Sequence, residues 1–171
     1  MESDERIEKI YYTKKNKLKF EIPYKNGKIN GIVKRYRTKD RPDIFASFKD
    51  GVLDGEFIAY NQYREKYIVR YYKNGLLDGK FTSYYPNGRI KEECMFEKGK
   101  CSDYWHSFKK SGQKEYEVEI HNHKITKAYI HFFLDPKRKF LLTDERIEQV
   151  KRRIEKSAKE GLSKLNQILK K

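Results

Sequence analysis

The sequence predicts a mainly β fold, in which a meandering antiparallel sheet of hairpin repeats is followed by a C-terminal amphipathic α-helix. Three observations support this prediction. The same landmarks return every 24 residues, which is typical of repeat architectures. Asn-Gly and Asp-Gly pairs stand between short aromatic and branched runs, a strong hairpin signal. After residue 134 the apolar period changes to that of a helix.

The repeat is defined by two glycines and a set of apolar positions. The first glycine of successive copies is Gly27, Gly51, Gly75 and Gly99. The second lies four places later, at Gly31, Gly55 and Gly79, with Asp103 in the fourth copy. An aromatic residue precedes each first glycine by three places, at Tyr24, Phe48, Tyr72 and Phe96. A further apolar residue follows it by six places, at Val33, Phe57, Phe81 and Trp105.

Five copies are expected, near residues 22–45, 46–69, 70–93, 94–117 and 118–134, with a half repeat before them, so that the array begins at about residue 11. The last copy is atypical, as terminal repeats often are, because His123 and Lys127 replace its glycines. Residues 1–134 are therefore one repeat array.

Each copy is expected to form a hairpin at its first glycine. The second glycine falls inside a strand, where glycine is normally unfavourable. Its recurrence predicts that a ring from the neighbouring strand lies across the bare backbone. The alternative is that it serves a second turn.

The motif aromatic-x-[ND]-G-x-[LI]-x-G-x-[FWV]-x-x-[YF], followed by a turn such as Pro86-Asn87-Gly88, resembles the MORN repeat. It is most similar to the bacterial variant found in YwqK-type antitoxins and immunity proteins. The resemblance covers about 110 of the 171 residues. It implies a sheet of successive hairpins and brings no catalytic residues. The departures at Asp103, His123 and Lys127 fall in the last hairpins.

Composition and charge limit the possible partners. The net charge of +15 attracts phosphates and anionic membranes at long range, although compositional bias is an alternative source of the lysines. No stretch approaches 18 apolar residues, and residues 1–9 lack the apolar core of a signal peptide. We therefore expect no transmembrane segment and a cytoplasmic protein.

The sequence contains no recognisable motif of an enzyme, metal site or cofactor site. There is no nucleophile elbow, P-loop or dinucleotide fingerprint. His121, His123 and His131 are close in sequence but lack further ligands at zinc-site spacing. Cys94 and Cys101 would lie about 7 to 8 Å apart on a diagonal of a hairpin, so buried thiols are expected rather than a disulfide. A non-enzymatic protein without metal or cofactor is the expectation.

The C-terminal part is divided into a basic linker, residues 135–142, and an amphipathic basic helix, residues 143–171. The apolar stripe of the helix steps by three and four residues through Ile147, Val150, Ile154, Ala158, Leu162, Leu165 and Leu169. This stripe could dock on the repeat array, associate with a partner or a second copy, or lie on a membrane surface.

Two functions remain open. In the first, the sheet is a protein-binding platform, and the resemblance makes it an antitoxin or immunity protein that neutralises a toxin. Its candidate binding rings are Tyr36, Tyr60, Tyr84, Trp105 and Phe108. In the second, the basic surface binds anionic lipid or nucleic acid. Its candidate anion-binding residues are Lys137, Arg138, Lys139, Lys151, Arg152 and Arg153. Self-association through the C-terminal helix or a sheet edge is a further possibility.

Overall fold

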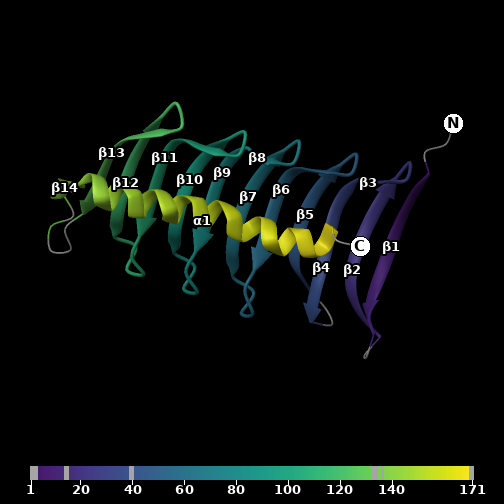
Figure 1. Ribbon diagram of the computed structural model, residues 1–171. Coiled ribbons are helices and arrows are strands. Elements are labelled where there is room, and N and C mark those ends of the chain that lie inside the picture. Colours follow the sequence, from purple (N-terminus) through teal and green to yellow (C-terminus); the bar gives the residue numbers. More distant parts are fainter. Residues whose placement is uncertain (1–3, 14–15, 39–40, 132–134, 136, 170–171) are drawn as a thin grey trace.

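The computed structural model describes residues 4–13, 16–38, 41–131, 135 and 137–169, and the helix side chains as far as Ala158. In the described residues, one 14-stranded antiparallel sheet is followed by a single helix (Figure 1). The strands are β1 (Glu5–Tyr12), β2 (Lys17–Lys25), β3 (Lys28–Ile29), β4 (Gly31–Thr38), β5 (Arg41–Lys49), β6 (Val52–Tyr60), β7 (Lys66–Lys73), β8 (Leu76–Leu77), β9 (Gly79–Tyr84), β10 (Ile90–Glu97), β11 (Lys100–Phe108), β12 (Lys114–His121), β13 (Lys124–His131) and β14 (Lys139–Leu141).

The strands pair in sequence order from β1 to β14, and the short β3 and β8 pair with β2 and β7. The predicted fold class is therefore confirmed. Two details differ at the ends of the array. A full strand, β1, begins at Glu5, before the expected start near residue 11, and β14 turns part of the predicted linker into an edge strand paired with β13.

Tight turns at the upper end of the sheet in Figure 1 explain the first glycine of each repeat. In the third copy both turn residues have positive φ, 49° at Asn74 and 80° at Gly75, the conformation of a type I′ hairpin. The Gly75 amide also donates to Leu53 O of the preceding repeat at 2.8 Å. In the fifth copy Asn122 and His123 adopt the same turn at φ values of 51° and 61°.

The ring predicted over the second glycine is only part of the reason for this residue. Ring atoms of Tyr71 lie 3.6 and 4.0 Å from the place of a Cβ on Gly79, whereas at Gly55 the neighbour is Ser47. The register partner of the second glycine is an aromatic residue of the next strand, as Gly79 pairs with Phe96. However, a Cβ atom on Gly79 would point to the preceding strand, 3.0 Å from Tyr71 Cβ. Its φ of +115° lies beyond the left-handed region that other residues tolerate. Backbone conformation and the preceding strand therefore impose this glycine, rather than the ring alone.

Alternate side chains of the strands divide the sheet into two faces, which we call the helix-bearing face and the open face. The pairing register shifts near the lower end in each repeat, for example between Ala59 and Tyr60 and between Ser107 and Phe108. These shifts are β-bulges, which place one extra residue on one strand. As a result, residues such as Lys91 and Glu115 at the bulges turn toward the helix-bearing face.

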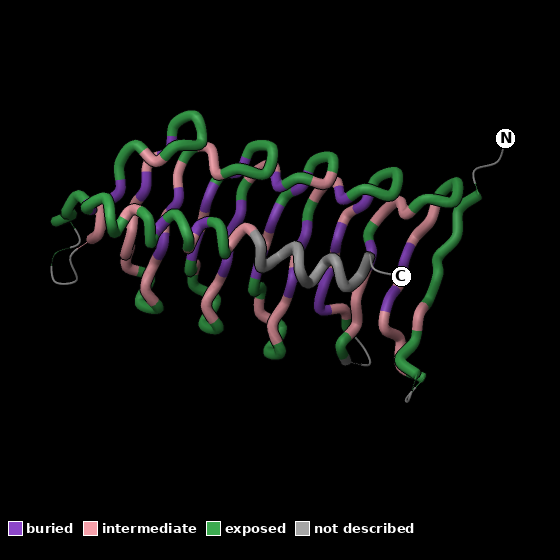
Figure 2. The backbone as a smooth tube through the Cα atoms, in the orientation of Figure 1, coloured by how far each residue is buried: buried purple, intermediate pink, exposed green. Residues whose placement is uncertain are grey.

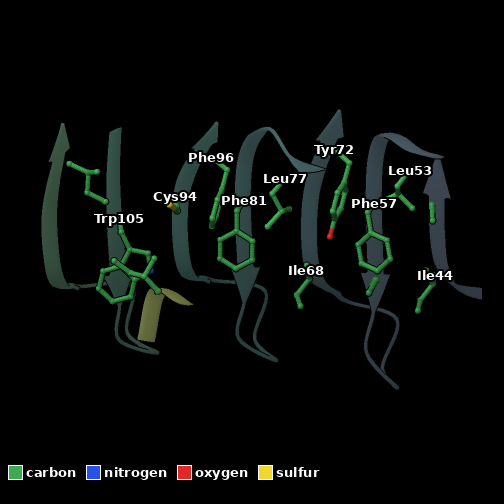
Figure 3. Packing of buried hydrophobic residues seen from close by; sticks show 14 of the residues in the cluster. Ile44, Leu53, Phe57, Ile68, Tyr72, Leu77, Phe81, Cys94, Phe96 and Trp105 are labelled. Atoms are coloured by element: carbon green, nitrogen blue, oxygen red, sulfur yellow. The ribbon is translucent and has the colours of Figure 1, made fainter. Parts of the chain in front are cut away.

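The hydrophobic core lies on the helix-bearing face, in rows that cross the strands (Figure 3). Phe57, Phe81 and Trp105, which occupy the same place in successive repeats, are each no more than 2% exposed. Their rings alternate with those of the next row, because Phe57 lies edge-on to Tyr72 at 6.4 Å and Phe81 to Phe96 at 6.1 Å. Buried residues occupy the middle of the strands, while the turns at both ends are exposed (Figure 2).

The helix α1 (Asp144–Leu169) runs across the strands on this face (Figure 1). Val150 and Ile154 are buried against the core, and Ile147 and Ala158 pack beside them. The predicted stripe therefore docks on its own chain as far as Ala158. Leu162, Leu165 and Leu169 lie outside the described side chains.

The expectation of two free thiols is wrong, because Cys94 and Cys101 form a disulfide. The predicted pairing of Phe96 with Cys101 is present, but the register shifts between Cys94 and Phe96. With this irregularity, the Cα atoms of the two cysteines are 6.6 Å apart, within the range that a disulfide spans. A regular ladder, on which the prediction relied, would have kept them farther apart.

Candidate functional site: the open face of the sheet

The open face is the large surface that no described element covers, because α1 lies on the other side. Its middle row follows the pairing register from strand to strand. The row consists of Lys34, Phe45, Ile58, Val69, Thr82, Glu93, His106, Glu117 and Tyr129. It changes along the sheet, since its members on β5–β7 are apolar and those on β10–β12 are ionisable.

The apolar zone of the open face surrounds Phe45. This ring lies edge-on to Tyr60, with centroids 6.1 Å apart. On the row above, Ile32 is 52% exposed and Tyr71 is 40% exposed. Large apolar groups gathered on an uncovered surface mark interaction sites more often than scattered ones do.

Four of the predicted binding rings form a line along the lower end of the open face. Tyr36, Tyr60, Tyr84 and Phe108 stand at the same place on alternate strands, so neighbouring rings are about 10 Å apart. Tyr36 Oη donates to Glu21 Oε2 at 2.9 Å. Burial, together with this hydrogen bond, raises the pKa of Tyr36 to about 12. All four rings are half-buried, and the hydroxyl of Tyr36 is held in place by Glu21.

A hollow of about 290 Å³ lies where the apolar zone meets this line of rings. Phe45 and Tyr60 contribute its aromatic walls. Arg37, Arg41 and Arg64 contribute positive charge around them. Asp43 is the one carboxylate among the described residues that line the hollow. It accepts two hydrogen bonds of 3.1 and 2.7 Å from Arg35, and Arg37 Nε lies 3.8 Å from it.

The ionisable zone begins at Glu93. Its carboxylate lies 3.1 Å from Lys80 Nζ and 3.3 Å from His106 Nδ1. Burial alone would raise the pKa of Glu93, but the hydrogen bonds from Lys80 and His106 lower it. Burial lowers the pKa of His106, and the positive charge of Lys114 acts in the same direction. Tyr104 stacks on the His106 imidazole at 4.7 Å.

A second cluster surrounds Glu117. Lys139 and Lys114 donate to its two oxygens at 3.0 and 3.2 Å, and His131 Nε2 lies 3.0 Å from Oε2. Burial would raise the pKa of Glu117, but the hydrogen bonds from Lys139, Lys114 and His131 and the charge of Lys114 outweigh burial and lower the pKa to about 2. Both clusters are closed networks of opposite charges, and neither places an unpartnered nucleophile or base beside a cavity.

Trp105, the fifth predicted binding ring, lies on the helix-bearing face and is only 1% exposed. The guanidinium of Arg153 on α1 lies 5.3 Å from its ring centroid. This ring is therefore not available to a partner, and its grouping with the exposed rings is wrong. The sequence contains the necessary signal, because Trp105 and Phe108 are three residues apart and an odd separation in a strand changes the face.

The predicted anion-binding residues are also separated. Arg153 faces the sheet and donates through Nε to Glu92 Oε1 at 3.0 Å, so its prediction as a surface anion ligand is wrong. Lys139 is held by Glu117, and Arg138 lies 5.1 Å from the Phe140 ring centroid. Lys137, Lys151 and Arg152 are exposed, and Lys151 pairs with Glu148.

The three histidines do not assemble into a metal site. His123 lies at a turn with Nδ1 3.3 Å from Cys101 O, whereas His131 contacts Glu117. No group of three or more His, Cys, Asp or Glu side chains with metal-binding geometry occurs in the part of the chain that the structure describes. Within the same residues, α1 is not apolar enough to span a membrane.

Comparison with known proteins adds no further assignment. No protein-family model matches the chain, and no curated protein matches it.

Proposed function

We propose that this chain is a non-enzymatic protein-binding platform and that its open face holds the partner. The single observation that carries the proposal is the uncovered apolar zone around Phe45, bordered by a regular line of half-buried rings. Protein interfaces are enriched in Tyr, Phe and Arg, and partly immobilised rings lose little entropy on binding.

The hollow beside Tyr60 indicates the chemistry of the partner. Aromatic walls with Arg37, Arg41 and Arg64 around them fit a projecting side chain flanked by carboxylates, because guanidinium groups bind carboxylates with two parallel hydrogen bonds. We therefore propose a partner with an acidic surface. The resemblance to YwqK-type proteins extends this proposal to an immunity protein or antitoxin whose partner is a toxin.

The location of the site is tested by Tyr60→Ala. Tyr60 lines the hollow, whereas Tyr63, three residues later, is 70% exposed in the adjacent turn, so Tyr63→Ala is the matched control. The product of the neighbouring open reading frame is the partner to test, by calorimetry. We expect Tyr60→Ala to weaken binding by about 30-fold, the order of a hot-spot residue, and Tyr63→Ala to leave it unchanged.

Two results would contradict different parts of the proposal. Equal affinities of the two variants would exclude the open face near Tyr60 as the binding site. A neighbouring gene product that neither binds the chain nor inhibits growth would exclude the toxin as partner. The proposal that the open face binds a protein would still stand. Sedimentation of the free chain tests for self-association. A wild-type dimer that Tyr60→Ala dissociates would mean that the partner on the open face is a second copy of the chain.

The alternative function is binding of anionic lipid or nucleic acid, favoured by the exposed Lys151 and Arg152 on α1. The matched test is the pair Lys151→Glu and Arg152→Glu, because Arg153→Glu would also break the contact with Glu92. We expect binding to duplex DNA no tighter than about 10⁻⁴ to 10⁻⁶ M at physiological salt. Sub-micromolar binding that this pair abolishes would favour the alternative.

A further inference from the structure

A polar cavity of about 260 Å³ lies between α1 and the sheet on the helix-bearing face, apart from the open face. Residues of β7, β9 and β10 form its floor, and α1 contributes Arg153, Lys156 and Ser157. Since a water molecule occupies about 30 Å³ in the liquid, the cavity has room for a small ligand with several waters. A cavity of this size is unusual beside a hydrophobic core, because protein interiors are closely packed.

Arg70 is the unusual residue of this cavity. At the equivalent place the neighbouring repeats have Ala46, Cys94 and Val118, whereas Arg70 is completely buried. Its Nη2 donates to Ser157 O at 2.7 Å and its Nη1 to Ala158 O at 3.4 Å. Its Nε has no hydrogen-bond partner. Among the described residues it forms no ion pair, although a buried charge without a counter-charge is costly.

A second polar atom in the cavity is also without a partner. Ser83 is 7% exposed, and its Oγ makes no hydrogen bond. Ser83 pairs with Ile68 on one side and with Glu92 on the other, and it lines the same cavity as Arg70. Two buried donors that open into one space are the arrangement expected around a bound acceptor.

The carboxylate in the cavity is already engaged. Glu92 accepts from Arg153 Nε at 3.0 Å and from Ser157 Oγ at 2.8 Å. Arg153 in turn contacts Glu115 at 3.5 Å. Beyond this network, the cavity is lined by the cations Arg70, Lys91 and Lys156. Waters could satisfy the two unpartnered donors, but they could not balance the buried charge of Arg70.

We propose that the cavity binds a small oxyanion of the size of phosphate or sulfate, which accepts hydrogen bonds from Arg70 Nε and Ser83 Oγ, with Lys91 and Lys156 at the entrance. A guanidinium is well suited to such oxygens. Because Arg70 also holds the carbonyls of α1, the anion fixes the helix on the sheet. The occupant that we propose is a free anion, because Arg70 and Ser83, which would hold it, are both buried.

Inorganic phosphate is the probe, with total ionic strength held constant by sodium chloride. We expect one saturable site by calorimetry and a melting temperature that rises with phosphate, because a ligand that binds only the folded state stabilises it. Ser83→Ala should weaken binding by about tenfold, the loss of one hydrogen bond to a charged group. Arg70→Gln should abolish binding, and if that variant does not fold, Ser83→Ala decides.

Two lysines of α1 give the matched control. Lys156 lines this cavity, whereas Lys151 lines a different groove on the helix. Lys156→Gln should weaken phosphate binding several-fold and Lys151→Gln should not, although both remove one positive charge. Equal losses of phosphate affinity in the two variants would mean a general effect of charge. A melting temperature that depends on ionic strength but not on phosphate would mean that the cavity holds only water. Either result overturns the proposal.

Vesicles that contain phosphatidic acid distinguish a lipid headgroup from the free anion. We expect vesicle binding, if measurable, to be the same for the wild type and Ser83→Ala. Vesicle binding that Ser83→Ala abolishes, with no saturable binding of inorganic phosphate, would assign the cavity to a headgroup and overturn the proposal of a free anion.

Discussion

The two faces of the sheet are made by alternate residues of the same repeats, but they meet different environments. The helix-bearing face has buried rings in the same place in successive repeats, and α1 packs on it through Val150 and Ile154. The open face has half-buried rings and ionisable clusters, and no described element covers it. Hence the repeat encodes a continuous core on one face, whereas on the other face it repeats the line of rings from Tyr36 to Phe108 and leaves the middle row to vary from copy to copy.

The difference is clearest within a single strand. Trp105 and Phe108 both lie on β11, and both are large apolar rings at repeat landmarks. Trp105 is 1% exposed beneath Arg153, whereas Phe108 is half-buried and edge-on to His106 at 6.4 Å. A recurrent spacing alone therefore does not distinguish a core residue from a surface residue. An odd or even number of residues between two positions of a strand does, because side chains alternate between the faces.

The largest expected effect follows from this pair. Trp105→Ala removes a buried ring and should lower the free energy of unfolding by about 3 to 5 kcal/mol. Phe108→Ala should lower it by less than about 1.5 kcal/mol. Urea unfolding followed by circular dichroism measures both. Equal losses would contradict the division of the sheet into a structural face and a binding face.

The sequence was sufficient for the architecture because its signals are local and repeated. The turn pairs, the 24-residue period and the helical stripe each follow from short-range chemistry. The structure contains the turns, the period and the stripe as far as Ala158. The sequence was insufficient for the cysteines and for the position of Arg153. Both depend on where a strand is irregular or which side of α1 meets the sheet, which are properties of the assembled fold.

Arg70 shows a further limit of sequence reasoning. Arg70 is one of 40 Lys and Arg residues in this chain, so composition alone does not distinguish it from the others. Comparison of equivalent repeat positions could have identified it, because its counterparts Ala46, Cys94 and Val118 are small or apolar. The unpartnered Nε and the cavity beside it could not have been found without the packing of α1.

A second prediction concerns Gly79, the second glycine of its repeat and the first residue of β9. Gly79→Ala should lower the free energy of unfolding by about 3 kcal/mol, because φ is +115° and the added Cβ would lie 3.0 Å from Tyr71 on the open face. The matched control is Gly88→Ala, where φ is +77° and nothing lies within 4 Å. This variant should lose only about 1 kcal/mol. Chemical denaturation of both variants is the measurement, and a larger loss at Gly88 would contradict the steric explanation.

A third prediction tests the bridge between β10 and β11 on the helix-bearing face. Reduction of the Cys94–Cys101 disulfide, whose residues are seven apart, should cost about 2.5 kcal/mol by the chain-entropy relation. Thiol titration under denaturing conditions should find no free thiol before reduction and both afterwards. The double variant Cys94→Ala, Cys101→Ala is the control, since a reducing agent should not change its stability. Two free thiols in protein kept in air would contradict the bridge.

The smallest expected effect is the pH response of the open face, where Glu117 is surrounded by Lys139, Lys114 and His131. The pKa of Glu117 is lowered from 4.5 to about 2, so the folded state binds this proton more weakly than the unfolded state. Its contribution to stability is therefore fully present above about pH 4.5 and is lost as the pH falls toward 2.

Because the cluster is open to solvent, we expect this contribution to be only about 1 kcal/mol. Glu117→Gln should be less stable than the wild type at pH 6, and the difference should shrink as the pH falls from 4.5 to 2. Glu119→Gln, which removes only a 3.8 Å ion pair with Lys127, is the control from the same strand. Urea denaturation at a series of pH values measures the difference. A gap between wild type and Glu117→Gln that stays constant down to pH 2 would mean that Glu117 contributes to stability by packing rather than by charge.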